Sequence, residues 1–102
     1  MKIGPSMPWQ VYILLCSDGS LYTGISTDVQ RRFTQHAAGR GAKYFRGRSP
    51  RRIVYLEAAH DRSSASRREM AIKKMCLTEK RSLISSADNQ VESLAEPEIL
   101  KI

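Results

Sequence analysis

The 102-residue chain is long enough for one domain with its own core, and its 41% hydrophobic and 26% charged residues exclude an intrinsically disordered chain. No apolar run approaches the ~20 residues of a membrane span, and the net charge of +7 favours a polyanionic partner. Residues 1–8 lack the apolar segment of a secretory signal, so we expect a flexible N-terminus and a cytoplasmic location.

A β-hairpin is the first predicted element. Residues 10–16 and 21–26 are rich in strand formers, and the Ser-Asp-Gly-Ser segment of residues 17–20 between them is a hairpin signal. A helix over 29–38 follows, capped by Thr27 or Asp28 and stopped at Gly39. After it we expect a basic loop over 39–51 and a strand over 53–58. Two more helices are predicted, one from Asp61 or Ser63 to about Lys74 and one from Glu79 to about Ser86, capped by Thr78.

The predicted order is β-β-α-β-α-α, which is an α/β (α+β) fold with a small three-stranded antiparallel sheet flanked by helices. We assign residues 9–86 to this domain. Residues 87–102 form an acidic tail with four acidic residues and one lysine, and a short helix is expected around 91–95.

The hairpin loop decides whether two tyrosines meet. A two-residue loop puts Tyr12 and Tyr22 on opposite faces, whereas a three-residue loop ending at Gly19 puts them on one face as diagonal neighbours. We expect the three-residue loop, because glycine suits its left-handed last position. Gly24 then lies opposite Tyr12, where a strand glycine indicates close approach of a ligand or, alternatively, a bulge.

The predicted first helix carries a candidate phosphate-binding arginine. Val29 and Phe33 define its apolar stripe, Arg32 and His36 share one edge of that stripe, and Arg31 points away. Arg32 is therefore placed to lean toward the tyrosines, where a guanidinium suits a phosphate oxygen. The alternatives are a surface ion pair for Arg32 and, for His36, a helix-end histidine favoured by the C-terminal dipole.

A carboxylate interrupts the apolar stripe of the predicted second helix. Ala65, Ile72 and Cys76 form this stripe, and Glu69 falls inside it. An ionised carboxylate facing a core costs several kcal/mol unless it is paired or binds a metal, and Mg²⁺ or Mn²⁺ would resolve the mismatch. The alternative is a capping box from Ser66 to Glu69, which would start the helix at Ser66.

The two cysteines do not form a metal or redox motif. Cys16 and Cys76 lie 60 residues apart and belong to no CxxC pair, so we expect no zinc site and two small buried hydrophobic side chains.

A basic segment carries the second signal for a polyanion. No acidic residue occurs between Arg31 and Arg52, and Tyr44 and Phe45 within this segment offer surfaces on which bases stack. A solvated basic face is the alternative, and charge alone names no reaction. The eight basic residues are Arg31, Arg32, Arg40, Lys43, Arg46, Arg48, Arg51 and Arg52.

The spacing of these motifs resembles a known family. The run Val11-Tyr12-Ile13, then Tyr22-Thr23-Gly24 ten residues on, then an arginine ten residues later and a glutamate on a later helix, resembles the GIY-YIG nuclease superfamily. Residues 21–33, followed by Gly41-Ala42-Lys43-Tyr44, resemble its short stand-alone YhbQ-type members. Departures are Gln10 before the first motif, Thr23 in the second, Ile25 after it, and Asn89 beyond the third predicted helix.

The resemblance implies a GIY-YIG domain that hydrolyses phosphodiester bonds with one Mg²⁺ or Mn²⁺ ion. It implies Glu69 as the metal ligand, Arg32 as the catalytic arginine, His36 near the scissile phosphate, and a tyrosine as general base. It favours Tyr12 as that base, with Tyr22 orienting water or contacting phosphate, although the residues themselves leave the choice open.

Nucleic acid is the expected partner, DNA rather than RNA, and no dedicated protein partner or membrane contact is predicted. Cleavage is expected to select structure or ends, with a role in DNA repair or processing. The competing interpretations are a non-catalytic nucleic-acid-binding module and an adaptor that docks through its acidic tail. The residues expected to contact nucleic acid are Gly24, Arg31, Arg40, Lys43, Tyr44, Arg46, Arg48 and Lys73.

Overall fold

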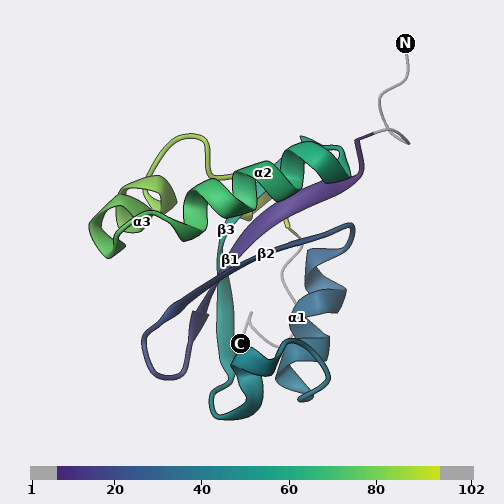
Figure 1. The fold of residues 1–102 in the computed structure, drawn as a ribbon, viewed down its shortest axis with the longest axis vertical. Coiled ribbons are helices and arrows are strands. Elements are labelled where there is room, and N and C mark those ends of the chain that lie inside the picture. The colour runs from purple at the N-terminus through teal and green to yellow at the C-terminus, as the bar shows by residue number, and fades with distance from the viewer. Residues whose placement is uncertain (1–6, 95–102) are drawn as a thin grey trace.

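The computed structural model describes residues 7–94 and has the predicted α+β architecture (Figure 1). A three-stranded antiparallel sheet of order β2-β1-β3 is flanked by helices. The elements in chain order are β1 (Trp9–Cys16), β2 (Leu21–Ser26), α1 (Val29–Ala37), the 3₁₀ helix η2 (Lys43–Arg46), β3 (Pro50–His60), α2 (Arg62–Lys73), α3 (Leu77–Ile84) and the 3₁₀ helix η3 (Val91–Ser93).

The hairpin has the expected three-residue loop. The N–H of Cys16 donates to the carbonyl of Ser20 at 2.9 Å, and Gly19 has a left-handed φ of 85°. Tyr12 lies opposite Gly24 in the register of β1 and β2, as predicted. The rings of Tyr12 and Tyr22 lie on one face of the sheet with centroids 6.3 Å apart.

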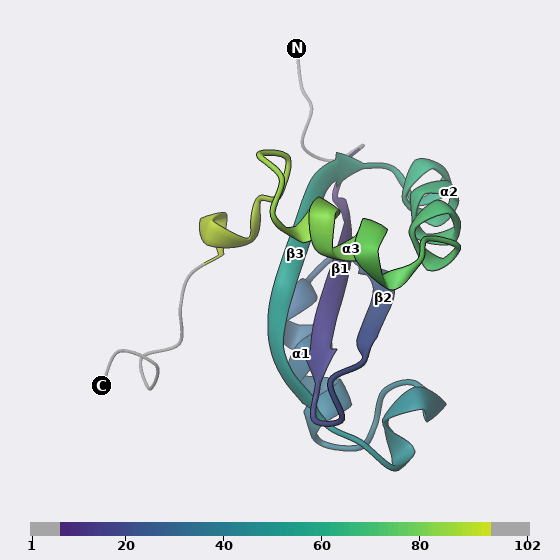
Figure 2. The ribbon, with the colours of Figure 1, turned by 90° about the vertical axis from the view of Figure 1, so that its left-hand side faces the viewer.

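The central strand β1 is buried on both faces, because helices cover the sheet from both sides (Figure 2). We call the two sides the α1 face and the α2 face. The buried cluster of the α1 face comprises Tyr12, Leu14, Cys16, Val29, Phe45 and Leu56. The buried cluster of the α2 face comprises Val11, Ile13, Tyr55, Ala65 and Ile72. The alternation of residues 11–16 between these clusters follows the two-residue period of a strand.

Each of the first two helices begins at a capping aspartate. The Asp28 carboxylate accepts the Arg31 N–H at 3.1 Å at the start of α1. Asp61 starts α2, with its carboxylate accepting the Ser64 N–H at 2.8 Å. The alternative capping box at Ser66 is therefore wrong, because α2 begins four residues earlier and Glu69 lies in its interior.

The third strand and the third helix differ from the predicted boundaries. β3 runs from Pro50 to His60 and includes ends that lack strand formers, and Ala59 there has a φ of 64°. α3 begins at Leu77 with Cys76 at its N-cap, where Glu79 accepts the Cys76 N–H at 2.9 Å. Cys76 is exposed, so its predicted burial is wrong, whereas that of Cys16 is confirmed.

The first residues of the predicted tail pack against the sheet. Asn89 accepts the Leu56 N–H at 3.1 Å and donates to the carbonyl of Val54 at 2.8 Å. Gln90 donates its N–H to the carbonyl of Leu56 at 2.8 Å and accepts the Ala58 N–H through its side chain at 2.8 Å. The rest of the tail, residues 95–102, and residues 1–6 lie outside the described residues.

Within residues 7–94, none of the helices is both long enough and apolar enough to span a lipid bilayer.

Candidate active site

A buried tyrosine–histidine pair lies beneath α1. The Oη of Tyr12 and the Nε2 of His36 are 3.1 Å apart, and each residue is only 1% exposed. Burial, with the nearby charge of Arg32, lowers the pKa of His36 to about 4, so the imidazole is neutral at pH 7. His36 does lie in the last turn of α1, but it is buried and neutral there, so the helix dipole does not stabilise a charge on it. His36 lies behind Tyr12, away from solvent.

Two glycines make room for this pair. A Cβ built on Gly24 would lie 2.5 Å from the Oη of Tyr12, and one built on Gly41 would lie 1.9 Å from the Nδ1 of His36. Both distances are far shorter than a real contact. Gly24 is thus accounted for by the protein's own tyrosine ring rather than by approach of a nucleic acid.

Tyr22 is the more accessible of the two phenols. It is only half-buried, and its ring contacts those of His36, Tyr44 and Phe45 at centroid distances of 5.4, 5.0 and 4.9 Å. This aromatic packing fixes the Tyr22 ring beside the Tyr12–His36 pair while leaving part of it in contact with solvent.

Burial and nearby charges set the protonation of both phenols. Burial raises the pKa of Tyr12 well above its usual range, the charge of Tyr22 raises it further, and the Arg32 guanidinium opposes the shift. Burial also raises the pKa of Tyr22, against opposing effects of Lys73 and Arg32. Glu69 raises the pKa of both tyrosines, so it lies within electrostatic range of both. Both phenols are protonated at neutral pH.

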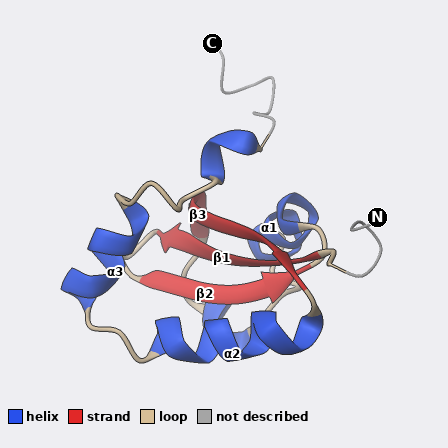
Figure 3. Ribbon diagram, turned by 90° about the horizontal axis from the view of Figure 1, so that it is seen from above, coloured by secondary structure: helices blue, strands red, loops and turns tan. Residues whose placement is uncertain are grey.

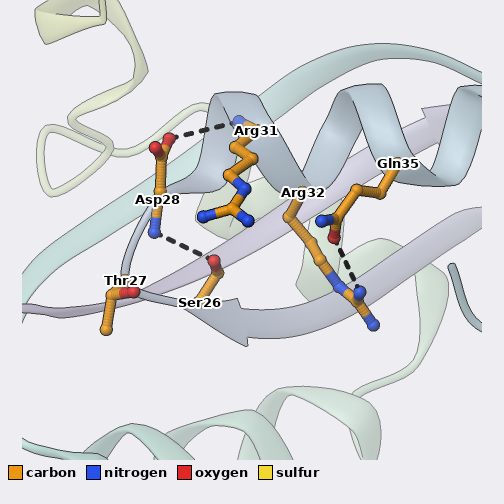
Figure 4. A pocket seen from close by; sticks show the side chains of 6 residues that line it. All are labelled: Ser26, Thr27, Asp28, Arg31, Arg32 and Gln35. Atoms are coloured by element: carbon orange, nitrogen blue, oxygen red, sulfur yellow. Dashed lines mark hydrogen bonds between the residues drawn. The ribbon is translucent and has the colours of Figure 1, made fainter.

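Arg32 extends from α1 over β2, the edge strand (Figure 4). Its Nη1 donates to the side-chain oxygen of Gln35 at 2.9 Å, which holds the guanidinium in place. A hollow of about 200 Å³ opens beside it, lined by Ser26, Thr27, Asp28, Arg31, Arg32 and Gln35. Arg32 alone of the predicted catalytic residues lines this hollow, and the exposed Arg31 lines it as well.

Glu69 approaches the tyrosines from the opposite side. It belongs to α2, which runs alongside β2 (Figure 3), and its side chain is 21% exposed, so it is largely but not completely buried. Its carboxylate pairs with the Nζ of Lys73, one helical turn further on, at 3.2 Å. Ala65 and Ile72 of the same helix are buried as predicted, so they anchor α2 and leave Glu69 at the rim of the sheet. Arg32 and Glu69 thus both lie within electrostatic range of the two tyrosines.

The donor set at this edge suits one kind of metal ion. Among residues 7–94, no three His, Cys, Asp or Glu side chains gather as metal ligands, which disfavours a closed site built from protein ligands. A single carboxylate with an accessible side chain fits Mg²⁺ or Mn²⁺, since such ions keep several waters and take substrate phosphate as a ligand.

Comparison with known proteins identifies the family. Residues 8–81 match the model of the GIY-YIG catalytic domain. The chain belongs to the GIY-YIG family. This is a family of nucleases, so the chain is a nuclease-family protein whose expected substrate is nucleic acid.

The chain also resembles short GIY-YIG relatives along most of its length. It is 46% identical over 90 residues to the UPF0213 protein DP2720 of Desulfotalea psychrophila, covering 87% of this chain and 82% of that protein. It is 40% identical over 95 residues to the UPF0213 protein YhbQ of Escherichia coli K12, covering 90% and 95%. The solution NMR structure of the UPF0213 protein BH0048 of Bacillus halodurans is 45% identical, with a TM-score of 0.51 and coverage of 82% and 89%.

Part of the basic segment has a structural role in this GIY-YIG domain. The Tyr44 hydroxyl donates to the Oγ of Ser20 at 2.6 Å, and the guanidinium of Arg48 stacks 4.0 Å from the Tyr44 ring centre. Arg48 also pairs with Asp18 at 3.2 Å. These contacts fasten the η2 segment to the hairpin. Phe45 is 6% exposed, so its predicted role as a stacking surface is wrong.

The other predicted contacts with nucleic acid remain accessible. The side chains of Arg31, Arg40, Lys43, Arg46 and Lys73 are exposed. Arg31 lies by the hollow at the start of α1, the next three follow that helix, and Lys73 lies on α2 beside Glu69. Exposed basic side chains thus come from α1, from the segment that follows it and from α2.

Three supporting residues of this GIY-YIG site were not predicted from sequence. Gln35 orients Arg32, Gly41 makes room for His36, and the Ala42 N–H donates to the Nδ1 of His36 at 3.3 Å. The three-residue spacing from Arg32 to Gln35 on a helix was an available signal for the first. The other two depend on how the chain turns back after α1, which no local pattern reveals.

Proposed function

We propose that this protein is a divalent-metal-dependent endonuclease that hydrolyses phosphodiester bonds in DNA and selects structure or ends rather than base sequence. The observation that carries the proposal is the convergence of two tyrosines, a held arginine and an accessible carboxylate at one sheet edge. The exposed basic side chains of α1, of the segment after it and of α2 attract a phosphate backbone.

Arg32 neutralises the charge that builds on the scissile phosphate. Its guanidinium is already oriented by Gln35, so little reorganisation is needed as that charge develops. Arg31, which lines the same hollow, binds a neighbouring phosphate of the same strand. Together they account for a preference for backbone over bases.

Tyr22 is the better candidate for the general base. It is half-exposed, and Lys73 and Arg32 both favour its ionised form against the effect of burial. Removing a proton from an ordinary phenol costs about 4 kcal/mol at pH 7, so cleavage rises with pH up to the pKa of this group. Tyr12 is buried and strongly favours its protonated form, and its hydroxyl forms a hydrogen bond with His36.

Glu69 would hold the metal ion, and Lys73 can release the carboxylate because the lysine side chain is exposed to solvent. When bound, Mg²⁺ or Mn²⁺ supplies Lewis-acid polarisation of the phosphate and stabilisation of the leaving oxygen.

A metal-dependent cleavage assay tests this function directly. Single-stranded, duplex and branched DNA, and RNA of matched sequence, are incubated with the protein and Mg²⁺, Mn²⁺ or EDTA. We expect cleavage of DNA that needs the metal and is lost in Glu69→Ala and Arg32→Ala. Activity that survives both substitutions would refute the proposal. Salt-sensitive binding with no cleavage on any substrate would instead favour the non-catalytic module.

A further inference from the structure

The hydrogen bonds of His36 fix where its proton lies. The Nδ1 atom faces the N–H of Ala42 at 3.3 Å, and a backbone N–H can only donate. Nδ1 therefore carries no proton, so the single ring proton of the neutral imidazole lies on Nε2. That nitrogen is 3.1 Å from the Oη of Tyr12, so the histidine donates this bond and the tyrosine accepts it.

We propose that the Gly41–Ala42 backbone holds His36 as the Nε2–H tautomer, so that His36 is a positioning residue that donates to Tyr12 and directs the Tyr12 proton away from the imidazole. The effect of this arrangement on cleavage rests on the proposed nuclease function, but the tautomer itself does not.

The space around His36 is built for this contact. A Cβ at residue 41 would lie 1.9 Å from Nδ1 and 2.6 Å from Cε1, so only glycine lets the turn approach the ring closely. Gly41 does not have a left-handed φ, so this close approach, rather than backbone conformation, accounts for glycine here. The ring of Phe45, with its centroid 4.4 Å from that of His36, closes another side.

The tautomer constrains the chemistry of the neighbouring phenol. Because the lone pair of His36 is on Nδ1 and occupied by Ala42, His36 offers no acceptor to the Tyr12 hydroxyl. Any proton that Tyr12 donates or releases must therefore go to another partner. An Nε2–H aimed at Oη also favours a phenol that donates elsewhere, because its lone pair is already engaged.

The titratable and charged groups that act on this pair come from three elements. They are Tyr22 on β2, Arg32 on α1 and Glu69 on α2, and each influences the protonation of Tyr12. Of these, Arg32 also acts on His36 and opposes its protonation. His36 is thus expected to remain the neutral Nε2–H tautomer across neutral pH.

Nitrogen-15 NMR of the folded wild-type protein tests the tautomer without any activity assay. Long-range correlations between the carbon-bound protons of the imidazole ring and its two nitrogens distinguish a protonated Nε2 from a protonated Nδ1. We expect His36 to give the Nε2–H pattern from pH 6 to pH 8, whereas exposed imidazoles titrate in this range. An Nδ1–H pattern, or an imidazolium at pH 7, overturns the proposal.

Two glycine substitutions test whether the turn is responsible. Gly41→Ala places a methyl group against Nδ1, whereas Gly47→Ala is the matched control because no atom lies within 4 Å of its Cβ position. We expect the first to lose the single Nε2–H pattern and the second to keep it. A folded Gly41→Ala protein with an unchanged His36 spectrum contradicts the assignment to the turn. If that variant does not fold, the wild-type spectrum still decides the tautomer.

Two histidine substitutions connect the tautomer to cleavage. The amide nitrogen of His36→Gln lies near the position of Nε2 and can donate to Tyr12, whereas that of His36→Asn lies near Nδ1 and cannot. We expect His36→Gln to retain most of the rate and His36→Asn to lose about tenfold in kcat with KM unchanged. Equal rates for the two variants overturn the positioning role. A wild-type protein that cleaves nothing refutes the nuclease proposal and leaves the NMR test in force.

Discussion

The two faces of the sheet bury different kinds of side chain. The α2 face buries aliphatic residues such as Ile13 and Ile72, and its charged pair, Glu57 and Arg68, lies at the partly exposed margin, 2.8 Å apart. The α1 face instead buries Tyr12 against His36, a polar pair within an aromatic cluster. The α2 face is thus stabilised mainly by apolar burial, whereas the α1 face also holds a hydrogen-bonded Tyr–His pair in a fixed orientation.

The largest expected effect contrasts two carboxylates on the α2 side. Glu69→Gln should reduce metal-dependent cleavage by about 10³-fold, because the amide is a poor metal ligand, while stability changes little because the partner Lys73 is exposed to solvent. Glu57→Gln should instead leave cleavage nearly unchanged and lower the stability of the protein. Burial raises the pKa of Glu57, but the hydrogen bond and charge of Arg68 outweigh it and lower that pKa, so the pair contributes to folding. Cleavage rates and denaturant unfolding are measured for both variants. Equal losses of activity in the two would contradict the prediction.

The second prediction compares one substitution on each face of the sheet. Ile72→Ala should destabilise the protein by about 3 kcal/mol, because it leaves a cavity at a fully buried position of the α2 face. Its cleavage rate per folded molecule should be unchanged. Tyr12→Phe should retain most of the stability and lose activity, and urea unfolding beside initial-rate measurements separates the two outcomes. Loss of kcat in folded Ile72→Ala would mean that the faces are not independent.

The third prediction concerns acid. His36 has a pKa of about 4 when folded against an ordinary 6.5, so the unfolded chain takes up its proton first and stability falls as pH drops from about 6.5 toward 4. Between pH 7 and pH 5 this group removes about 2 kcal/mol. The same pH change should cost His36→Gln about 2 kcal/mol less. An identical acid dependence in both proteins would show that the histidine is not buried in its neutral form.

The smallest expected effect concerns Thr23, whose buried hydroxyl has no hydrogen-bond partner among residues 7–94. Thr23 is 2% exposed, and its β1 partner is Ile13, on the aliphatic face. Thr23→Val keeps the shape and removes the unsatisfied group, so we expect stabilisation by about 1 kcal/mol with unchanged cleavage. A decrease in the unfolding midpoint would indicate that the hydroxyl has a partner after all.

Local signals in the sequence were sufficient for much of this molecule. The hairpin register followed from loop length and the position of Gly19, and the caps at Asp28 and Asp61 followed from residue type. The placement of Arg32 beside the tyrosines followed from helical geometry. These features depend on neighbours within a few residues, where stereochemistry leaves few alternatives.

The failures involve contacts between distant segments. The burial of Phe45 and the tethering of Tyr44 to Ser20 depend on the η2 segment folding back over the hairpin, which a basic composition conceals. The partial exposure of Glu69 depends on how α2 is rotated against the sheet. Helical spacing gives the relative angles of side chains but not the absolute orientation of the helix.

The hydrogen bonds from Asn89 and Gln90 to the outer side of β3 have a consequence for the solution behaviour of the protein. The N–H and C=O groups of Leu56 on this side would otherwise be open to a strand of another molecule. By occupying them, these two residues prevent intermolecular β-sheet extension, a common route to aggregation. The segment after α3 thus covers part of the free edge of β3, although it lies far along the chain from that strand.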